Sequence, residues 1–369
     1  GVSVYSTPQR FSFALSSTEL RTSRFLVIFQ ASLTSSSPRI YDRLCLAMSS
    51  IPTASCTLVL TGKSSTEKDF AKSLKSINLP ECETLISSEI SNAEHSFKAS
   101  VYMNALSTRT FGRLLIYSPR LPSTHDVVSN NFEEMPLGSV CVTDIQTRGR
   151  GRSQNAWASP LGSLLFSFTL QMEDGRVVPL LQYVVSLAVV EAIKDVCKAN
   201  NSPSLEVNIK WPNDLYMNNL KIGGVLCTST YKSKKFNICA GVGLNVDNEE
   251  PTTCLNSTLK KMNPSGDSLQ REYILAAFFN RFEHFLELFI NKGFGSLEEM
   301  YYNAWLHGGQ KVTVLNEREG KMEESVVTIQ GLNASGFLIA VGEDNVMCEL
   351  HPDGNSFDFF KGLIRRKIG

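Results

Sequence analysis

At the centre of this chain stands Thr143-Asp-Ile-Gln146-Thr-Arg148-Gly149-Arg150-Gly151-Arg152-Ser-Gln-Asn-Ala-Trp157. Arginines alternate with glycines in it, directly after an apolar run that predicts a β-strand. Glycine lets the backbone approach a ligand closely, and arginine offers a planar, permanently charged fork that suits phosphate and carboxylate. By itself the stretch fits a loop that wraps an anion, a solvated basic loop, or an RNA-binding Arg-Gly segment.

Regular hydrophobic patterns flank this stretch on both sides. Their spacing predicts strands at 111–117, 139–144, 164–170, 207–211, 221–226 and 236–246, with an irregular segment at 118–122. It predicts a buried helix at 178–197, an amphipathic helix at 269–292 and a short helix at 297–305. Asn218-Asn219 predicts a hairpin turn. Lys210 and Lys221 are therefore expected on adjacent strand ends that flank one turn. The helix at 178–197 carries Gln182, Ser186 and Glu191, so it is expected in the core and not in a membrane.

The pattern changes after His307-Gly308-Gly309. Short apolar runs at 311–315, 325–330, 336–341 and 346–350 are separated by turn residues. Strands at this spacing predict a small β-barrel of about sixty residues, with a boundary near 307–310.

The composition disfavours binding to nucleic acid, binding to a membrane, and a metal site built by the protein. The chain has 369 residues and a formal net charge of zero, so no overall field draws it to nucleic acid or to an anionic membrane. Its nine cysteines include no C-x-x-C pair, and its five histidines make no H-E-x-x-H pattern. We therefore expect no metal site built by the protein, and reduced cysteines in a reducing compartment.

The first fifty residues differ from the rest. Residues 1–50 are rich in serine and arginine, contain no lysine, and have Glu19 and Asp42 as their acidic residues. This composition predicts an organelle transit peptide, with a tail that carries no address as the alternative. Initiation at Met48 would then give an untargeted, cytosolic form. Residues 51–110 predict an accessory α/β segment that lacks a DNA-binding recognition helix.

Several polar motifs follow strands or precede helices. They are Ser123-Thr124-His125, Lys210-Trp-Pro-Asn213-Asp214-Leu215, Lys221-Ile-Gly-Gly224 and Gly241-x-Gly-x-Asn245. Each has an ordinary structural interpretation, since hydroxyls cap helices, Asn and Asp make turns, and lysines are commonly solvated. Gly241-x-Gly lacks the third glycine and the following helix of a dinucleotide site.

Taken in order with Gly149-Arg150-Gly151-Arg152 and Trp157, these motifs resemble the catalytic module of biotin protein ligases, plant enzymes in particular. The resemblance covers roughly residues 111–363. It implies an α+β fold, with a class II synthetase-like mixed β-sheet flanked by helices in residues 111–307. A small SH3-like β-barrel in residues 308–369 would follow.

The resemblance implies an ATP-dependent ligase. Biotin and ATP would form biotinyl-5′-AMP, and biotin would then pass to a lysine of the carrier domain of a biotin-dependent carboxylase. Mg²⁺ would accompany ATP, and neither nucleic acid nor membrane is implied. The transit peptide would direct the chain to the plastid or mitochondrion. Fixed positive charge and N–H donors must offset the repulsion between the carboxylate and the α-phosphate.

The resemblance also implies roles for single residues. The catalytic set is Lys221, Arg152, Arg150 and Asp214. The biotin-binding set is Ser123, Thr124, His125, Gln146, Arg150, Gly151, Arg152 and Lys221. The adenylate-binding set is Gly149, Trp157, Lys210, Asn213 and Asn245. His125 stands where bacterial relatives have asparagine.

Two other functions are weighed beside this one. Lipoate or octanoyl ligases share the catalytic fold, although they are not expected to combine G-R-G-R with K-W-P-N-D. A non-catalytic nucleic-acid binder would use the Arg-Gly loop, and the zero net charge disfavours it.

Overall fold

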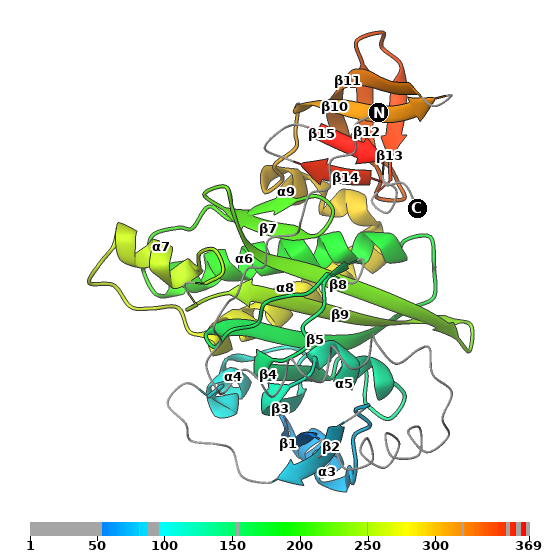
Figure 1. Ribbon diagram of the computed structural model, residues 1–369. Coiled ribbons are helices and arrows are strands. Elements are labelled where there is room, and N and C mark those ends of the chain that lie inside the picture. The colour runs from blue at the N-terminus through cyan, green and yellow to red at the C-terminus, as the bar shows by residue number, and fades with distance from the viewer. Residues whose placement is uncertain are drawn as a thin grey trace, which may run out of the picture. The chain divides into compact units, whose positions relative to one another are not determined.

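The computed structural model describes residues 54–80, 82–87, 96–152, 155–248, 250–318, 321–351, 355–358 and 363–366. The predictions for residues 1–50, including the transit peptide and initiation at Met48, lie outside the described residues. Within these ranges the strands form a nine-stranded sheet and a six-stranded sheet (Figure 1). In the same ranges, no helix has both the length and the apolarity that a membrane span requires.

The larger sheet is mixed, as predicted. Its strand order is β2-β1-β3-β4-β5-β9-β8-β7-β6. The strands are β1 (Ala54–Gly62), β2 (Cys82–Ser87), β3 (Leu114–Leu121), β4 (Val140–Gln146), β5 (Ser163–Met172), β6 (Asn208–Lys210), β7 (Asp214–Met217), β8 (Leu220–Lys232) and β9 (Lys235–Asn245). β3 runs parallel to β4, whereas β4, β5, β9, β8, β7 and β6 pair antiparallel in turn. β1 and β2, from the N-terminal segment, extend this same sheet at its edge.

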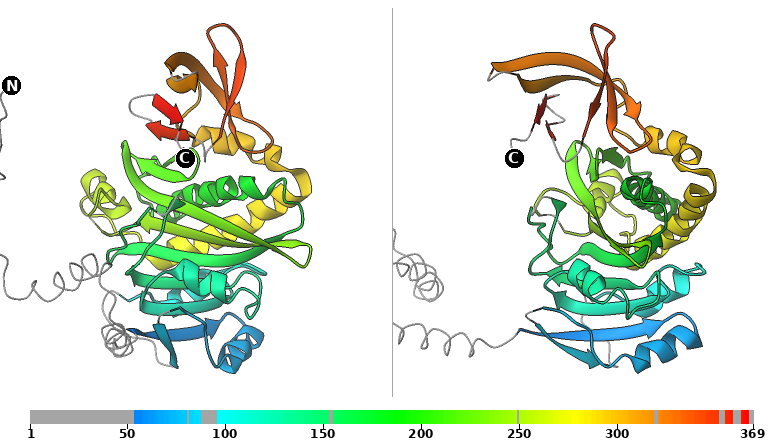
Figure 2. Two further views of the ribbon diagram at one scale, coloured as in Figure 1. Left: turned by 45° about the vertical axis from the view of Figure 1, so that its right-hand side comes forward. Right: turned by 90° about the vertical axis from the view of Figure 1, so that its right-hand side faces the viewer.

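The side chains of each strand alternate between the two faces of the larger sheet, and a separate hydrophobic cluster forms on each face. Leu115 and Tyr117 on β3 belong to the larger cluster, whereas Ile116 between them belongs to the smaller one. The larger cluster packs under the helices α4 (Ala99–Ala105), α6 (Leu181–Ala199) and α8 (Arg271–Lys292), and Figure 2 shows α6 and α8 lying along the sheet. The smaller cluster packs under α5 (Thr124–Asn130). Because side chains alternate between faces with period two, α5 covers the opposite face from α6 and α8.

The helix predictions are confirmed. A short 3-10 turn, Val178–Leu180, leads into α6, and α8 ends at Gly293, which has a φ of 75°. The remaining helices are α3 (Ser65–Ser73), α7 (Leu255–Met262) and α9 (Glu298–Asn303). Asn218 and Asn219 both have positive φ between β7 and β8, which is the backbone that a tight hairpin turn requires.

One strand prediction is wrong. Residues 118–122 were expected to be irregular, but β3 continues through Pro119 to Leu121. Its partner β1 stops pairing at Tyr117, whereas its partner β4 continues to pair as far as Leu121. The side of β3 towards β1 is therefore a free edge at Pro119, where a missing N–H breaks no ladder.

The smaller sheet follows residue 310, as predicted. Its order is β13-β12-β11-β10-β15-β14, and its strands are β10 (Lys311–Arg318), β11 (Lys321–Leu332), β12 (Leu338–Gly342), β13 (Met347–Leu350), β14 (Asn355–Asp358) and β15 (Leu363–Arg366). The four predicted strands correspond to β10 to β13, and β14 and β15 were not predicted. This sheet fits the expected SH3-like domain.

Candidate functional site

A cavity of about 320 Å³ opens on the face of the larger sheet that carries α5. Twelve of the residues proposed for the site line it: Ser123, Thr124, His125, Gln146, Arg150, Gly151, Arg152, Trp157, Lys210, Asn213, Asp214 and Lys221. Gly149 and Asn245 do not line it. The folded chain thus brings together side chains from separate strands, a helix start and two loops.

One end of the cavity is built from neutral polar groups. Ser123 caps α5, and its hydroxyl accepts from the backbone N–H of His125 at 3.2 Å. The backbone N–H of Thr124 donates to Oε1 of Gln146 at 2.9 Å, and the Thr124 hydroxyl lies 2.9 Å from that of Ser167. The cap interpretation of Ser123 is therefore confirmed. The hydroxyl and amide groups around it also offer several donors and acceptors to a ligand.

His125 is buried beside this polar end. Its Nε2 lies 2.8 Å from the hydroxyl of Thr228, and its Nδ1 lies 3.3 Å from Sγ of Cys239. Burial, and then the positive charge of Arg150, lower the pKa of His125 to about 4. The imidazole is therefore neutral near pH 7.

Cationic side chains line the rest of the cavity. Nζ of Lys221 lies 2.7 Å from Oδ1 of Asp214. Arg152 donates to Oδ1 of Asn213 at 3.4 Å, and Arg150 forms an ion pair with Asp126. Lys221, Arg152 and Arg150 thus each have a polar partner whose place an anionic ligand could take.

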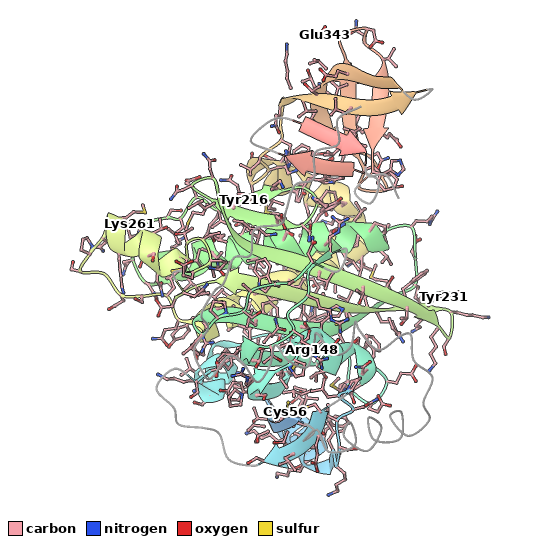
Figure 3. All side chains as sticks on the ribbon, in the orientation of Figure 1. Cys56, Arg148, Tyr216, Tyr231, Lys261 and Glu343 are labelled. Carbon is pink, nitrogen blue, oxygen red and sulfur yellow. The ribbon has the colours of Figure 1, made fainter. Side chains whose placement is uncertain are left out.

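The Gly-Arg loop is a hairpin closed by backbone bonds. Trp157 donates its backbone N–H to the carbonyl of Gly149 at 2.9 Å, and Gly151 donates to Asn155 at 2.7 Å. A side chain at Gly149 would approach the carbonyl of Trp157 to 2.5 Å, so the strands of the hairpin can meet here because this residue is glycine. Gly149 therefore shapes the loop from outside the cavity. Arg148, which is labelled in Figure 3, lines a separate hollow with Asp126 and Arg150.

The indole of Trp157 forms a wall of the cavity. Nζ of Lys221 lies 5.2 Å from the centre of its ring, within the range of a cation–π contact. A Cβ at Gly243 would meet Nε1 of the indole at 2.5 Å, so the indole packs directly against the backbone of β9. Among the described residues, that buried Nε1 has no hydrogen-bond partner.

The turn from Lys210 to Asp214 also lines the cavity. The side-chain amide of Asn213 donates to the carbonyl of Val225 at 2.6 Å, and the amide of Val225 donates back to the carbonyl of Asn213 at 2.8 Å. Lys210 and Lys221 were predicted on adjacent strand ends, and this is wrong. β7 lies between their strands β6 and β8, because the Pro212 turn and the Asn218-Asn219 turn are separate hairpins.

Asn245 lies behind the cavity. Its side-chain amide donates to the carbonyl of Thr253 at 3.0 Å, and the hydroxyl of Thr252 donates to the carbonyl of Lys221 at 2.5 Å. Asn245 therefore supports the turn that holds the backbone of Lys221.

Asp126, Ser167, Thr228 and Cys239 are contacts that the sequence did not reveal. Ser167 offered a signal, since it interrupts the apolar run of β5 between Phe166 and Phe168. The others come together through long-range folding alone. No group of histidine, cysteine or acidic side chains among the described residues is arranged to hold a metal ion.

Comparisons with known proteins agree on one family. The model described as "Biotin/lipoate A/B protein ligase family" matches residues 117–245, and that described as "Biotin protein ligase C terminal domain" matches residues 307–362. The chain is 62% identical over 325 residues to "Biotin--protein ligase 1, chloroplastic" of Arabidopsis thaliana, which covers 85% of this chain and 89% of that protein. It is 34% identical over 300 residues to "Biotin--protein ligase" of Homo sapiens, covering 78% of this chain and 40% of that protein.

A solved structure shares the fold. The biotin protein ligase from Aquifex aeolicus, in complex with biotin and ATP, superposes with a TM-score of 0.51 at 26% identity. The match covers 64% of this chain and 94% of that chain.

Proposed function

The chain belongs to the biotin protein ligase family and is an enzyme that ligates biotin to protein, and on that premise we propose that it works in two steps. In the first, a carboxylate oxygen of biotin attacks the α-phosphorus of ATP, and pyrophosphate leaves with the electrons of the broken P–O bond. In the second, a lysine amine of a carboxylase carrier domain attacks the acyl carbon, AMP leaves, and the amine loses a proton as the amide forms.

The observation that carries this proposal is the change in polarity along the cavity, from neutral hydrogen-bonding groups at one end to positive charge at the other. Biotin has a neutral, polar ureido ring at one end and a carboxylate at the other. Ser123, Thr124 and Gln146 supply hydrogen-bonding groups that such a ring needs when it is buried. Arg152 and Lys221 supply positive charge for the carboxylate and the α-phosphate. Gly151 lines the same cavity and lets the loop lie close to the ligand.

Lys221 is the proposed main electrophilic catalyst. Its ammonium is now paired with Asp214, so a bound carboxylate or phosphate oxygen would replace that carboxylate as its partner. Asp214 is then available as the group that accepts the proton of the carrier lysine. Arg150 and Arg152 would stabilise the charge that develops on the transferred phosphoryl group, as preorganised donors do. His125, neutral and buried, would bound the biotin end of the cavity.

The adenylate would lie against Trp157. The indole, with Lys210 and Asn213 lining the same cavity, suits a flat base and the phosphates attached to it. Mg²⁺ would enter as the counterion of ATP. Gly149 and Asn245 would act indirectly, through the loop and through the backbone of Lys221.

The protein substrates proposed are the carrier domains of biotin-dependent carboxylases. We also propose that residues 1–50 direct the chain to a plastid, a proposal supported by their composition and by the chloroplastic relative. A mitochondrial destination and a cytosolic form that begins at Met48 remain further proposals.

Transfer of radiolabelled biotin to a purified carrier domain tests this function. The wild type should label the carrier in the presence of ATP and Mg²⁺, and Arg152→Ala should lower the rate by roughly 10²–10³. Supplying preformed biotinyl-5′-AMP separates the steps. Asp214→Asn should then remain slow if Asp214 is the base. Intact transfer with slow adenylation would exclude that role, and a carrier labelled by lipoate and not by biotin would exclude the function.

A further inference from the structure

The turn from Lys210 to Asp214 is held from behind by the C-terminal part of the chain. Trp211, the second residue of this turn, is buried. Its indole N–H lies 3.0 Å from the hydroxyl of Tyr183 on α6 and 3.2 Å from the carbonyl of Gly336. The Tyr183 hydroxyl donates to the same carbonyl at 2.5 Å. A single carbonyl of the smaller sheet thus accepts bonds from the turn and from α6.

Gly336 lies in the turn between β11 and β12, at the end of the smaller sheet that faces α6. Glu343, in the turn at the other end of β12, lies at the far end of that sheet (Figure 3). Gly336 has a φ of 81°, and a Cβ there would meet the ring of Tyr183 at 2.7 Å. Its turn is fixed by Asn333, whose side-chain oxygen accepts from the amides of Ser335 and Phe337 at 2.9 Å each. The carbonyl of Gly336 is therefore presented by a rigid turn.

The segment that leads into the smaller sheet holds the other side of Trp211. The backbone N–H of Trp211 donates to Nε2 of His307 at 2.9 Å, and Nδ1 of His307 lies 3.1 Å from Oε1 of Gln310. The strand before it is tied to the same segment, because Ile209 donates to Ala304 at 2.7 Å and Leu306 donates to Ile209 at 3.0 Å. Both the backbone and the indole of Trp211 are thus bonded outside the turn.

We infer that the C-terminal sheet positions the catalytic turn Lys210–Asp214 through Trp211, with Tyr183, His307 and Gly336 as positioning residues. This inference rests on the proposed function, because it assigns a task to the wall of the same cavity. The front of the turn carries Asn213 and Asp214, whose side chains reach Arg152 and Lys221. A looser back of the turn should therefore disturb catalysis more than biotin binding, because the groups proposed to bind the ureido ring of biotin lie at the start of α5 and on β4.

The full chain allows a matched test. Tyr183→Phe and Tyr302→Phe each remove one phenolic hydroxyl that is bonded to the backbone of the smaller sheet. The Tyr183 hydroxyl donates to the carbonyl of Gly336, and the Tyr302 hydroxyl accepts from the amide of Leu332 at 2.9 Å. Tyr302 does not bond to Trp211, so it serves as the control. His307→Leu removes the acceptor for the Trp211 amide, and His307→Gln restores one near the position of Nε2.

Two measurements are made on each variant: biotin-dependent ATP–pyrophosphate exchange, and hydrogen–deuterium exchange of peptides covering residues 209–215. His307→Leu should lower kcat by roughly 10- to 100-fold while the KM for biotin stays within about twofold. Its loop peptide should exchange roughly fivefold faster, as expected for the loss of one hydrogen bond. Tyr183→Phe should show the same two changes with smaller size. His307→Gln should recover most of the kcat. Tyr302→Phe should keep the kcat and the deuterium exchange rate of the wild type.

Equal loss of kcat in Tyr302→Phe, or no recovery in His307→Gln, would overturn the inference. So would unchanged deuterium exchange in His307→Leu. A wild-type chain without biotin-dependent exchange would instead refute the proposed function, and the deuterium exchange would then decide the positioning claim by itself.

Discussion

Gly243→Ala tests whether Trp157 forms the adenylate wall. The added Cβ would lie 2.5 Å from Nε1 and 2.7 Å from Cε2 of the indole. Carbon atoms in contact are normally about 3.5–4.0 Å apart, so the ring must move by about 1 Å or the strand must shift. Overpacking of this kind costs roughly 1–3 kcal/mol. If a base stacks on the indole, displacement forfeits up to about 1–3 kcal/mol of stacking, which is roughly 5- to 150-fold in the KM for ATP.

Biotin-dependent ATP–pyrophosphate exchange, measured as a function of ATP concentration, gives that KM. Gly224→Ala is the comparison, because a Cβ there would meet Trp157 no closer than 3.7 Å, an ordinary contact. We expect a much larger rise in the KM for ATP in Gly243→Ala than in Gly224→Ala, with a smaller change in the KM for biotin in both. An unchanged KM for ATP in a folded Gly243→Ala would refute the assignment of Trp157.

Three further predictions concern pH and biotin. Burial opposes ionisation of Glu67, but hydrogen bonds from Arg113 and Ser64 outweigh it and hold the pKa of Glu67 at about 2, below its ordinary 4.5. Its contribution to stability should therefore be complete above pH 4.5 and disappear as the pH falls towards 2, so the Tm difference between wild type and Glu67→Gln should shrink over that range. Burial, and then nearby Arg150, lower the pKa of His125 from 6.5 to about 4, so the wild type should lose stability as the pH falls below 6.5. In urea unfolding, the free energy of unfolding of His125→Gln should therefore fall less between pH 6.5 and 5 than that of the wild type. Gln146→Leu removes the oxygen that accepts from Thr124 and should raise the KM for biotin by roughly 5- to 30-fold, which corresponds to about 1–2 kcal/mol, without a comparable change in the KM for ATP.

Local patterns predicted much of the fold. The helices α6 and α8 follow from apolar spacing, and the β7–β8 hairpin follows from Asn218-Asn219, because each depends on residues close in sequence. The continuation of β3 through Pro119 could not be predicted in this way. It depends on where β1 stops pairing, which the local sequence does not record.

The same distinction between local sequence and long-range contacts applies to the functional site. The Gly-Arg loop, Lys221 and the Lys210–Asp214 turn were found as motifs, and the fold brings them to one cavity. The partners that hold them were not predicted. Asp126 pairs with Arg150, and Gly336 bonds to Trp211 from 125 positions away in the chain. Such contacts depend on tertiary packing, and nothing in the residue types alone distinguishes Gly336 from other turn glycines.

The central claim is that Lys221 and its neighbours activate biotin with ATP. Its most direct test is ATP–pyrophosphate exchange by wild type and Lys221→Ala, each with biotin or with lipoate. The account predicts exchange by the wild type with biotin, little with lipoate, and a loss of roughly 10²–10³ in Lys221→Ala. Exchange that requires lipoate, or a Lys221→Ala variant as fast as the wild type, would contradict it.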